Sequence, residues 1–479
     1  MPIVKIQEPI IRMDATGGTI DSLAVSDSLL PRNAVRKGVN VMLDRPRGAV
    51  SQRSGTTALG LVVSAGNTIL GLHNYRTSTG TNRLLSAATT IIYSYNGTSW
   101  SSSLSGLTSG LKTRFLTYLD VCAFLNGQNQ PQSFNGSAWV ASGGALDINN
   151  MPIGKFATIL NSRVLVAGVS SATDTVYESS LEASNAISWS SGNRNFKVFP
   201  NDGSGDITSL SGNGRLVLIF KERAMYRYDN NEVQRVANIG TTSHESVIVD
   251  DNGITYFFGT GIGGVGFYQT DGGLPQKISR PVVKWVEAIA GSFYDDVAAA
   301  CDGKKIFWSV GSVTVDGTTY SKCAIVYTIA DEMWEVRNYD DDFRVFGQYV
   351  NSSGNITVVG GDADGFVQTM DSGNTDNGAA IFSECEFAPD VLTGRGRIKT
   401  VNSMHVYAQD FQGLEFYMKV DNGRYEPMGS IDAREKTFKN MPKLRGQTFY
   451  PKITAVNSGT PFVFEGFEYS DVSDEGYVL

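Results

Sequence analysis

Residue types that build catalytic and metal sites are scarce in this chain of 479 residues. The chain holds only three histidines and four cysteines, namely His73, His244, His405, Cys122, Cys301, Cys323 and Cys385. No histidine stands in a G-x-S-x-G elbow or a metal motif, and no two cysteines form a C-x-x-C pair. We therefore expect buried thiols, with no disulfide framework, zinc site or cofactor. The lack of candidate chemistry favours a protein that is not an enzyme.

Long apolar runs and an excess of basic residues are missing too. No apolar run approaches the roughly 18 residues that cross a membrane, so we expect no membrane span. The start of the chain lacks a long apolar segment, so we expect no signal peptide. Acidic residues (48) outnumber lysine and arginine (40), and the net charge of −8 argues against a chain-wide footprint for nucleic acid. Proline is low at 14 residues, so the 52 glycines indicate turns instead of low-complexity linkers.

What the sequence does contain is one small pattern repeated seven times: an apolar strand, a tight polar turn and a second apolar strand. The turns are marked by residue types that favour turns, at Gly66, Asp120, Asn161, Asn213, Asn252, Asp302 and Ser353. Successive markers lie 54, 41, 52, 39, 50 and 51 residues apart. Strand repeats of roughly 40 to 50 residues are typical of β-propellers.

An internal duplicate supports the strand assignment. Residues 94–100 match residues 133–139 at an offset of 39. Each copy places an aromatic residue before Asn-Gly and a tryptophan after it, which predicts a hairpin with a type I′ turn. No window of comparable length shows sustained helical periodicity, so we predict an all-β chain with very little helix.

The repeats divide the chain into three predicted parts. Residues 1–55 form an N-terminal arm and closing strand, and residues 56–375 form a β-propeller of about seven blades, with six to eight possible. Residues 376–479 form a C-terminal β-sandwich-like domain, in which apolar residues alternate from Leu414 to Val420. The acidic stretch 470–475 is expected to fray.

The N-terminal leader is the most basic part of the chain. Between positions 32 and 53, one acid stands among six basic residues: Arg32, Arg36, Lys37, Arg45, Arg47 and Arg53. Such a segment can add a strand to the last blade or reach a neighbouring subunit. Docking onto an acidic partner subunit is our first interpretation, while contact with phosphate and a plainly solvated arm stay open. Arg395 and Arg397, followed by Lys399, form a second cluster of the same kind.

Three motifs suggest chemistry but fit turns better. Residues 259–264 match G-x-G-x-x-G, yet the strand-like residues 265–269 follow where a nucleotide site needs a helix. Residues 362–365 begin like a calcium loop, but Phe366 and Gly373 occupy positions where an EF-hand needs acids. The two Asn-Gly hairpins resemble the Asp box of sialidase-type propellers only superficially, because asparagine replaces aspartate. No motif nominates a pair of carboxylates for glycoside hydrolysis.

The layout of the whole chain carries a further indication. The leader contains Gly38–Leu43, and Gly48–Gly55 leads directly into the first repeat. After the repeats, the chain closes with Lys443–Ile453 and a final strand at Pro461–Tyr469. This order resembles the tail hub or nozzle proteins of short-tailed bacteriophages, which include packaged-DNA stabilisation proteins and tubular tail proteins.

The resemblance implies a structural role with no catalytic residues. Members of this family form a ring, usually of six subunits, below the portal and adaptor proteins of the head–tail connector. Their propellers surround a channel through which double-stranded DNA passes without sequence-specific binding, and the outside supports fibres, spikes or a needle. The implied location is the virion tail, after synthesis in the host cytoplasm. An acidic chain suits such a channel, because each basic contact would add affinity for phosphate.

Two other classes of function stay open. A carbohydrate-processing propeller, such as a depolymerase or a sialidase-like enzyme, would present a cleft with two juxtaposed carboxylates. A carbohydrate- or receptor-binding module would bind glycans without chemistry and without forming a ring.

Overall fold

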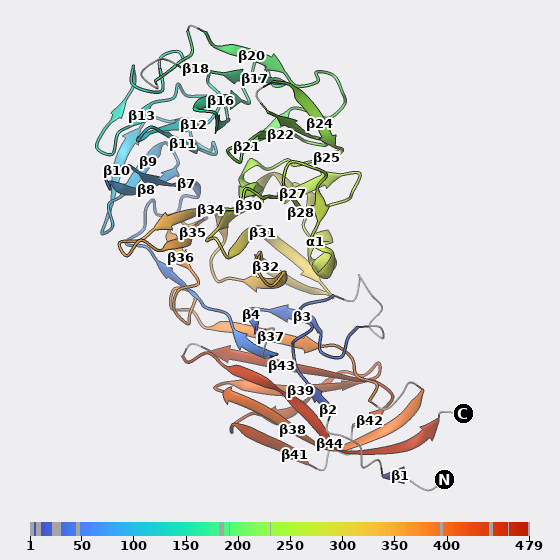
Figure 1. Cartoon of the computed structure of the whole chain (residues 1–479). Coiled ribbons are helices and arrows are strands. Elements are labelled where there is room, and N and C mark those ends of the chain that lie inside the picture. Colours follow the sequence, from blue (N-terminus) through green and yellow to red (C-terminus); the bar gives the residue numbers. More distant parts are fainter. Residues whose placement is uncertain are drawn as a thin grey trace.

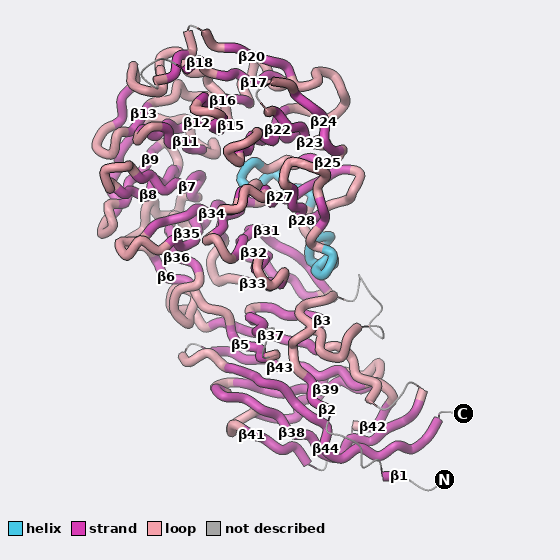
Figure 2. The backbone as a smooth tube through the Cα atoms, viewed as in Figure 1, coloured by secondary structure: helices cyan, strands magenta, loops and turns pink. Residues whose placement is uncertain are grey.

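The computed structural model describes residues 4–5, 11–21, 30–44, 48–181, 186–190, 192–229, 231–392, 396–439, 444–457 and 459–477. A ring of small sheets lies beside a second β-domain that holds both ends of the chain (Figure 1). Strands and loops make up almost all of the described chain, as the tube view shows (Figure 2). Helix is confined there to α1 (Val283–Glu287) and the short 3-10 turns η2 (His244–Ser246), η3 (Arg280–Val282) and η4 (Gly291–Asp296). The prediction of an all-β chain is confirmed.

Seven antiparallel units of four strands form the propeller within the described residues, as predicted. Blade 1 consists of β7 (Ile69–Arg76), β8 (Asn82–Ala88), β9 (Ile91–Tyr95) and β10 (Trp100–Ser105). Blade 2 consists of β11 (Arg114–Tyr118), β12 (Val121–Leu125), β13 (Ser133–Phe134) and β14 (Trp139–Val140). Blade 3 consists of β15 (Phe156–Leu160), β16 (Arg163–Ala167), β17 (Thr175–Glu178) and β20 (Arg194–Lys197). Blade 4 consists of β21 (Ile207–Gly212), β22 (Val217–Lys221), β23 (Met225–Tyr228) and β24 (Val233–Ala237). The short strands β18 (Ser180–Leu181) and β19 (Ile187–Ser188) pair with each other between β17 and β20 in the sequence.

The remaining three blades complete the ring. Blade 5 consists of β26 (Ile248–Val249), β27 (Thr255–Gly261), β28 (Gly266–Thr270) and β29 (Gln276–Lys277), and β25 (Ile239–Gly240) also pairs with β27. Blade 6 consists of β30 (Ala298–Cys301), β31 (Lys305–Val315), β32 (Thr318–Thr328) and β33 (Met333–Asn338). Blade 7 is β34 (Phe343–Val350), β35 (Ile356–Asp362), β36 (Val367–Met370) and β6 (Thr56–Ala58). The first strand of blade 7, β34, contacts the first strand of blade 1, β7, and so closes the circle.

The N-terminal segment supplies the outermost strand of the last blade. Strand β6 runs antiparallel to β36, with Thr56 opposite Met370 and Ala58 opposite Gln368. This strand begins directly after the basic leader, which itself belongs to the other domain. The last blade is therefore built from residues more than 300 positions apart in the sequence.

Six of the seven predicted turns join the first two strands of a blade, as at Asp120 between β11 and β12. The first is wrong. Gly66 lies before β7, where its N–H donates to the carbonyl of Asp364 (2.9 Å) in the neighbouring blade. The inner hairpin of blade 1 turns at residues 77–81 instead, between β7 and β8. That turn is made of threonine, serine and glycine, which signal turns less strongly than Asn-Gly or Asp-Gly.

The second domain is a sandwich of two sheets. One sheet joins β37 (Ile381–Phe387), β43 (Phe449–Asn457), β39 (Leu414–Val420) and β40 (Tyr425–Ser430), with β3 (Val35–Val39) added at β37. The other contains β4 (Val41–Asp44), β5 (Ala49–Gln52), β44 (Val463–Tyr477), β38 (Arg397–Asp410) and β41 (Glu435–Lys439), with β1 (Val4–Lys5), β2 (Ile11–Met13) and β42 (Arg445–Gly446) paired to its long strands. Buried aromatic rings, including Phe387, Phe416 and Phe467, fill the space between the sheets.

The described residues of the leader and the acidic stretch 471–474 both form strands of this sandwich. Strand β3 pairs with β37, and β5 pairs with β44, so the leader contributes to both sheets. Residues 471–474 lie within β44 and pair with β38, contrary to the expected fraying. A parallel bridge between Val39 and Val336 also joins β3 to β33, so the sheet of blade 6 continues into the sandwich.

Candidate functional site

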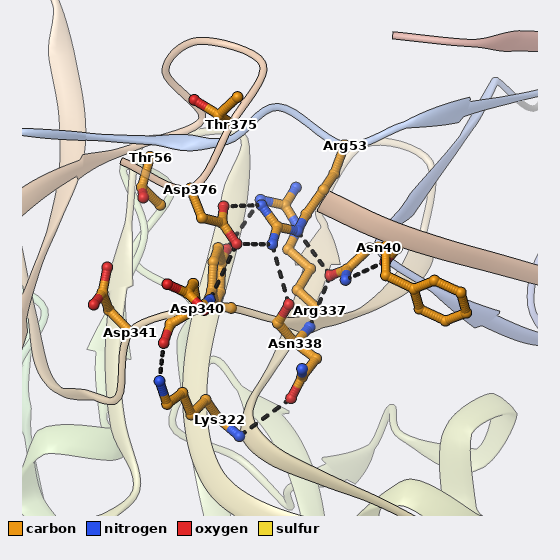
Figure 3. Close-up of polar contacts among 12 residues, drawn as sticks. Asn40, Arg53, Thr56, Lys322, Arg337, Asn338, Asp340, Asp341, Thr375 and Asp376 are labelled. Atoms are coloured by element: carbon orange, nitrogen blue, oxygen red, sulfur yellow. Dashed lines mark hydrogen bonds and ion pairs between the residues drawn. The ribbon is translucent and has the colours of Figure 1, made fainter. Parts of the chain in front are cut away.

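Arg53 lies at the centre of the junction between propeller and sandwich, which we define by Asn40, Arg53, Asn338, Tyr339 and Asp376 (Figure 3). Its side chain is fully buried. All five N–H donors are used: Nε to Asn40 Oδ1 (2.8 Å), Nη1 to Ser54 O (3.0 Å) and Asp376 Oδ1 (2.7 Å), and Nη2 to Asn338 O (3.1 Å) and Asp376 Oδ2 (2.7 Å). The guanidinium also lies 4.3 Å from the ring centroid of Tyr339. One side chain therefore ties the leader to blade 6 and to the loop after blade 7.

Asn40 is a junction residue that the sequence did not reveal. It stands between β3 and β4 with a φ of +57°, a left-handed conformation that asparagine tolerates better than most residues. Its Oδ1 accepts from the backbone N–H of Asn338 (2.8 Å) as well as from Arg53. Its Nδ2 donates to the carbonyl of Phe382 (2.7 Å) on β37. The amide thus bridges β33, the last strand of blade 6, and β37 of the sandwich.

Arg36 and Lys37 of the predicted interface are also paired inside the chain. Arg36 Nη1 lies 3.0 Å from Glu386, and Lys37 Nζ lies 3.3 Å from Glu384, both acids being on β37. Burial tends to raise the pKa of Glu384, but Lys37 and Lys452 outweigh burial and hold that pKa below its ordinary value. These basic residues therefore stabilise carboxylates of the sandwich.

The other predicted interface residues are distributed around the sandwich. Arg32 is half-exposed and pairs with the buried Asp390 (3.2 Å), and burial still raises the pKa of that carboxyl. Arg397 pairs with Asp474 (2.7 Å). Arg45, Arg47 and Arg395 lie outside the described residues. The structure therefore brings no exposed basic patch together from the described members of the set.

A second site lies where the first strands of several blades approach one another. We call Lys112, Arg114, Glu245, Asp296 and Arg344 the axial cluster. Lys112 Nζ pairs with Asp296 (2.9 Å) and Glu245 (3.7 Å), and Arg114 Nη2 pairs with Glu245 (2.6 Å). All except Arg114 line a pocket of about 180 Å³, together with residues 68–70 and Val345. Blades 1, 2 and 7 and the segments before blades 5 and 6 all contribute.

The electrostatics of the axial cluster favour fixed charges. Burial tends to raise the pKa of Glu245, but Arg114 and Lys112 outweigh burial and lower that pKa to about 2. Burial lowers the pKa of His244 to about 4, and Arg114 adds to the effect. His244 Nδ1 lies 2.8 Å from the hydroxyl of Ser209. A glycosidase acid needs a raised pKa, so an ionised Glu245 is poorly suited to donate a proton at neutral pH.

The remaining motifs are hairpins and turns. Residues 259–264 form the end of β27 and the turn into β28, as predicted. In the 362–365 turn, Asp362 Oδ1 accepts from the backbone of Asp364 and Phe366. The Asn-Gly hairpins join β9 to β10 and β13 to β14, but only their glycines take positive φ. The asparagine side chains instead accept backbone N–H groups, so the type I′ assignment is wrong. In the described part of the chain, no group of three or more His, Cys, Asp or Glu side chains could hold a metal ion.

Comparisons with known proteins identify no family for this chain. No family model matches it, and no curated protein matches it. Solved structures that are similar to it include the extracellular domain of a putative hybrid two-component system from B. thetaiotaomicron (TM-score 0.45, 10% identity, 80% of this chain and 48% of that chain), the WD40 β-propeller domain of Doa1 (0.42, 9%, 66% and 96%) and the CNH domain of AfRom2 (0.38, 11%, 65% and 98%).

The chain spans about half the length of the first of these structures. All three similarities are too weak to carry an argument about function. The assignment as a β-propeller joined to a β-sandwich-like domain agrees with the strand pairings described above. No helix in the described residues is both long and apolar enough to span a membrane.

Proposed function

We propose that this protein is a structural subunit of a short-tailed bacteriophage tail, acting in the hub or nozzle ring below the portal and adaptor. The observation that carries the proposal is the junction, where the leader joins propeller and sandwich through the fully buried Arg53 and a continuous sheet. A subunit that must transmit force between head and tail needs domains that do not move independently. Inter-domain contacts resist motion when they are extensive and buried.

The proposal assigns a different role to the basic leader than docking alone. Its described charges pair with Asp376, Glu384, Glu386 and Asp390 of the same chain, so the leader locks the subunit internally. The proposed partners are other copies of this chain, the connector proteins, and the fibre, spike or needle proteins. Double-stranded DNA would pass through the ring without sequence-specific contacts.

Light scattering and negative-stain microscopy of the purified chain, with and without the other tail proteins, test this role. The expected result is a ring, and six subunits is the number that the resemblance implies. A chain that stays monomeric with all tail partners present would overturn the proposal. A second readout is incorporation into tails, which should fail when residues 1–50 are deleted.

A receptor-binding propeller is the second candidate, and one groove favours it. A groove of about 420 Å³ is lined by β20, the loop after it, and the segment around β24. Arg194 is held there by two hydrogen bonds to the buried Glu178 (2.9 Å each), and Phe196 packs on Tyr228 at 4.5 Å. Aromatic rings with a few fixed polar groups are typical of small-ligand sites. Glycan binding by the isolated monomer, abolished by Phe196→Ala, would favour this candidate over a tail ring.

A further inference from the structure

We infer that the outer edge of blades 1 and 2 is the surface through which one copy of this chain contacts another. The inference rests on the proposed function, since it assigns the contact between copies within the ring. It locates that contact away from the basic leader, whose described charges are paired within the chain.

The first observation is an absence of charge. Residues 84–111 and 121–146, which we call the neutral sector, contain no Asp, Glu, Lys or Arg. The whole chain is 18% charged, so a sector of 54 residues would be expected to hold about ten charged side chains. The charges that separate the two stretches are used elsewhere: Lys112 and Arg114 belong to the axial cluster, and Asp120 bonds to Ser78.

The sector forms one continuous surface across two blades. Trp139 Nε1 on β14 donates to Ser103 Oγ on β10 (2.9 Å). The backbone N–H of Thr108 likewise donates to Asn129 Oδ1 (2.8 Å). The exposed positions are mostly serine, threonine, asparagine and glycine, as at residues 96–99 and in the turn at 141–144. Burying such a surface requires no ion to be desolvated and orders few long side chains.

The second observation is an open strand edge. Strand β10 is the outermost strand of blade 1, and among the described strands it pairs with β9 alone. Natural sheets commonly protect such edges with charged side chains, short strands or covering elements. The outer strands of the other six blades each show one of these protections. Strands β20, β24 and β29 carry Lys or Arg, and β33 is covered by β3. Strands β14 and β6 are short, with two and three residues. Strand β10 has six residues and none of these three protections, and the register of its pairing with β9 shifts between Ser102 and Leu104.

The net charge of the chain identifies a second copy as the occupant. Two copies that each carry a net charge of −8 repel one another, and a contact surface without charge adds no close like-charge pairs to that repulsion. A partner of opposite charge would gain affinity from a charged surface. A neutral edge with a free strand therefore suits contact between identical chains, through main-chain hydrogen bonds to β10.

Two substitutions of equal chemistry test the assignment. Ser102→Lys places a charge on the exposed part of β10, and Gln276→Lys places the same charge on the exposed outer strand β29 of blade 5. Sedimentation velocity over a concentration series measures self-association. Ser102→Lys is expected to weaken association about tenfold or more, because an unpaired ammonium would be buried in the contact. Gln276→Lys is expected to leave association unchanged.

Thiol labelling provides a readout that does not depend on disrupting the contact. The four native cysteines are all buried, so Ser102→Cys introduces the one exposed thiol of the described chain. Maleimide labelling at that position should slow several-fold when the protein is concentrated into its assembled form, while labelling of Gln276→Cys should not. Normal association of Ser102→Lys with equally fast labelling would overturn the inference and leave the ring proposal standing. A wild-type chain that never self-associates would overturn both.

Discussion

Arg53 shows how one basic residue of the leader is used within the fold. Its partner Asp376 is also buried, and the bidentate pair lies between two domains. Fixed hydrogen bonds compensate the loss of hydration because all five donors are satisfied. Lysine could not reproduce this arrangement, since it presents a single charge without the planar fork.

Replacing Arg53 should therefore destabilise the protein far more than replacing an exposed arginine. Arg53→Met leaves Asp376 buried without its cation and should lower the free energy of unfolding by about 3–5 kcal/mol. Arg445→Met also removes an ion pair, with Glu475, but Arg445 is 57% exposed, so this substitution should change the free energy of unfolding far less. Urea unfolding followed by tryptophan fluorescence measures both variants. Equal midpoints would contradict the role given to the junction.

The axial cluster predicts how stability depends on pH. The pKa of Glu245 is about 2 in the folded chain, below its ordinary 4.5, so the unfolded state takes up the proton first as pH falls. This contribution is complete above about pH 4.5 and is lost as pH falls towards 2. His73 and His244, both at a pKa of about 4 because of burial, act in the same direction between pH 6.5 and 4.

The substitution Glu245→Gln distinguishes the pH range in which Glu245 titrates from the range in which His73 and His244 titrate. The variant should lose stability at neutral pH, because Arg114 and Lys112 lose their buried partner. It should also show a flatter decline than the wild type between pH 4.5 and 2, while the decline from 6.5 to 4 persists. Unfolding free energies measured at each pH provide the comparison. An unchanged slope below pH 4.5 would show that Glu245 does not carry this titration.

At the scale of elements, the two short strands on either side of Arg53 have separate tasks. Strand β5 pairs with β44 in the sandwich, whereas β6 pairs with β36 in blade 7. The chain passes from one domain to the other within a few residues. The leader and the closing strand can therefore be removed one at a time.

Two truncations exploit this arrangement. Deleting residues 1–50 keeps Arg53 and β6, so the propeller should remain closed while the sandwich loses β1 to β4 and the first half of β5. Deleting residues 1–60 also removes β6 and Arg53, and should lower the thermal midpoint of the propeller further, because blade 7 loses its outer strand. Differential scanning calorimetry can resolve the two domains. Identical propeller transitions in both truncations would contradict a closing role for β6.

The propeller could be predicted from local signals, whereas the junction could not. Residue type alone predicts turns such as those at Asn161 and Asn252, and the apolar strands beside these turns repeat at regular spacing. The partners of the leader are different in kind, because Arg53 meets Asp376 across 323 positions and Asn40 meets Phe382 across 342. No local pattern indicates such pairs. A run of basic residues therefore predicts an exposed interaction surface as long as the positions of the acidic residues that pair with it are unknown.

At the scale of the whole molecule, charge is distributed unevenly around the propeller. Blades 1 and 2 carry the neutral sector, while the outer strands of blades 3, 4 and 5 carry lysine and arginine. Salt screens both the repulsion between like charges and the attraction within ion pairs. Added salt should therefore strengthen a contact made by the neutral sector and weaken a contact made by ion pairs.

Salt dependence therefore distinguishes the two kinds of contact between copies. If the neutral sector forms the contact, raising the salt concentration from 0.05 to about 0.5 M should strengthen self-association, since it screens the repulsion between chains of net charge −8. If basic residues of one copy met acids of the next, association should weaken over the same range. Sedimentation equilibrium at several salt concentrations measures the sign of this change.

The position of the leader also sets an order of events during synthesis. The leader is synthesised before the seven blades, yet its strands pair with β37 and β44, which are made after them. The last blade likewise waits for β36 before β6 can close it. The propeller cannot close until β36 has been translated, and the sandwich cannot finish folding until β44 has been translated, because pairings this distant cannot form earlier. A chain that stopped before β36 would leave both domains open, and one that stopped between β36 and β44 would leave the sandwich incomplete. Neither product could enter an assembly that requires both domains to be closed.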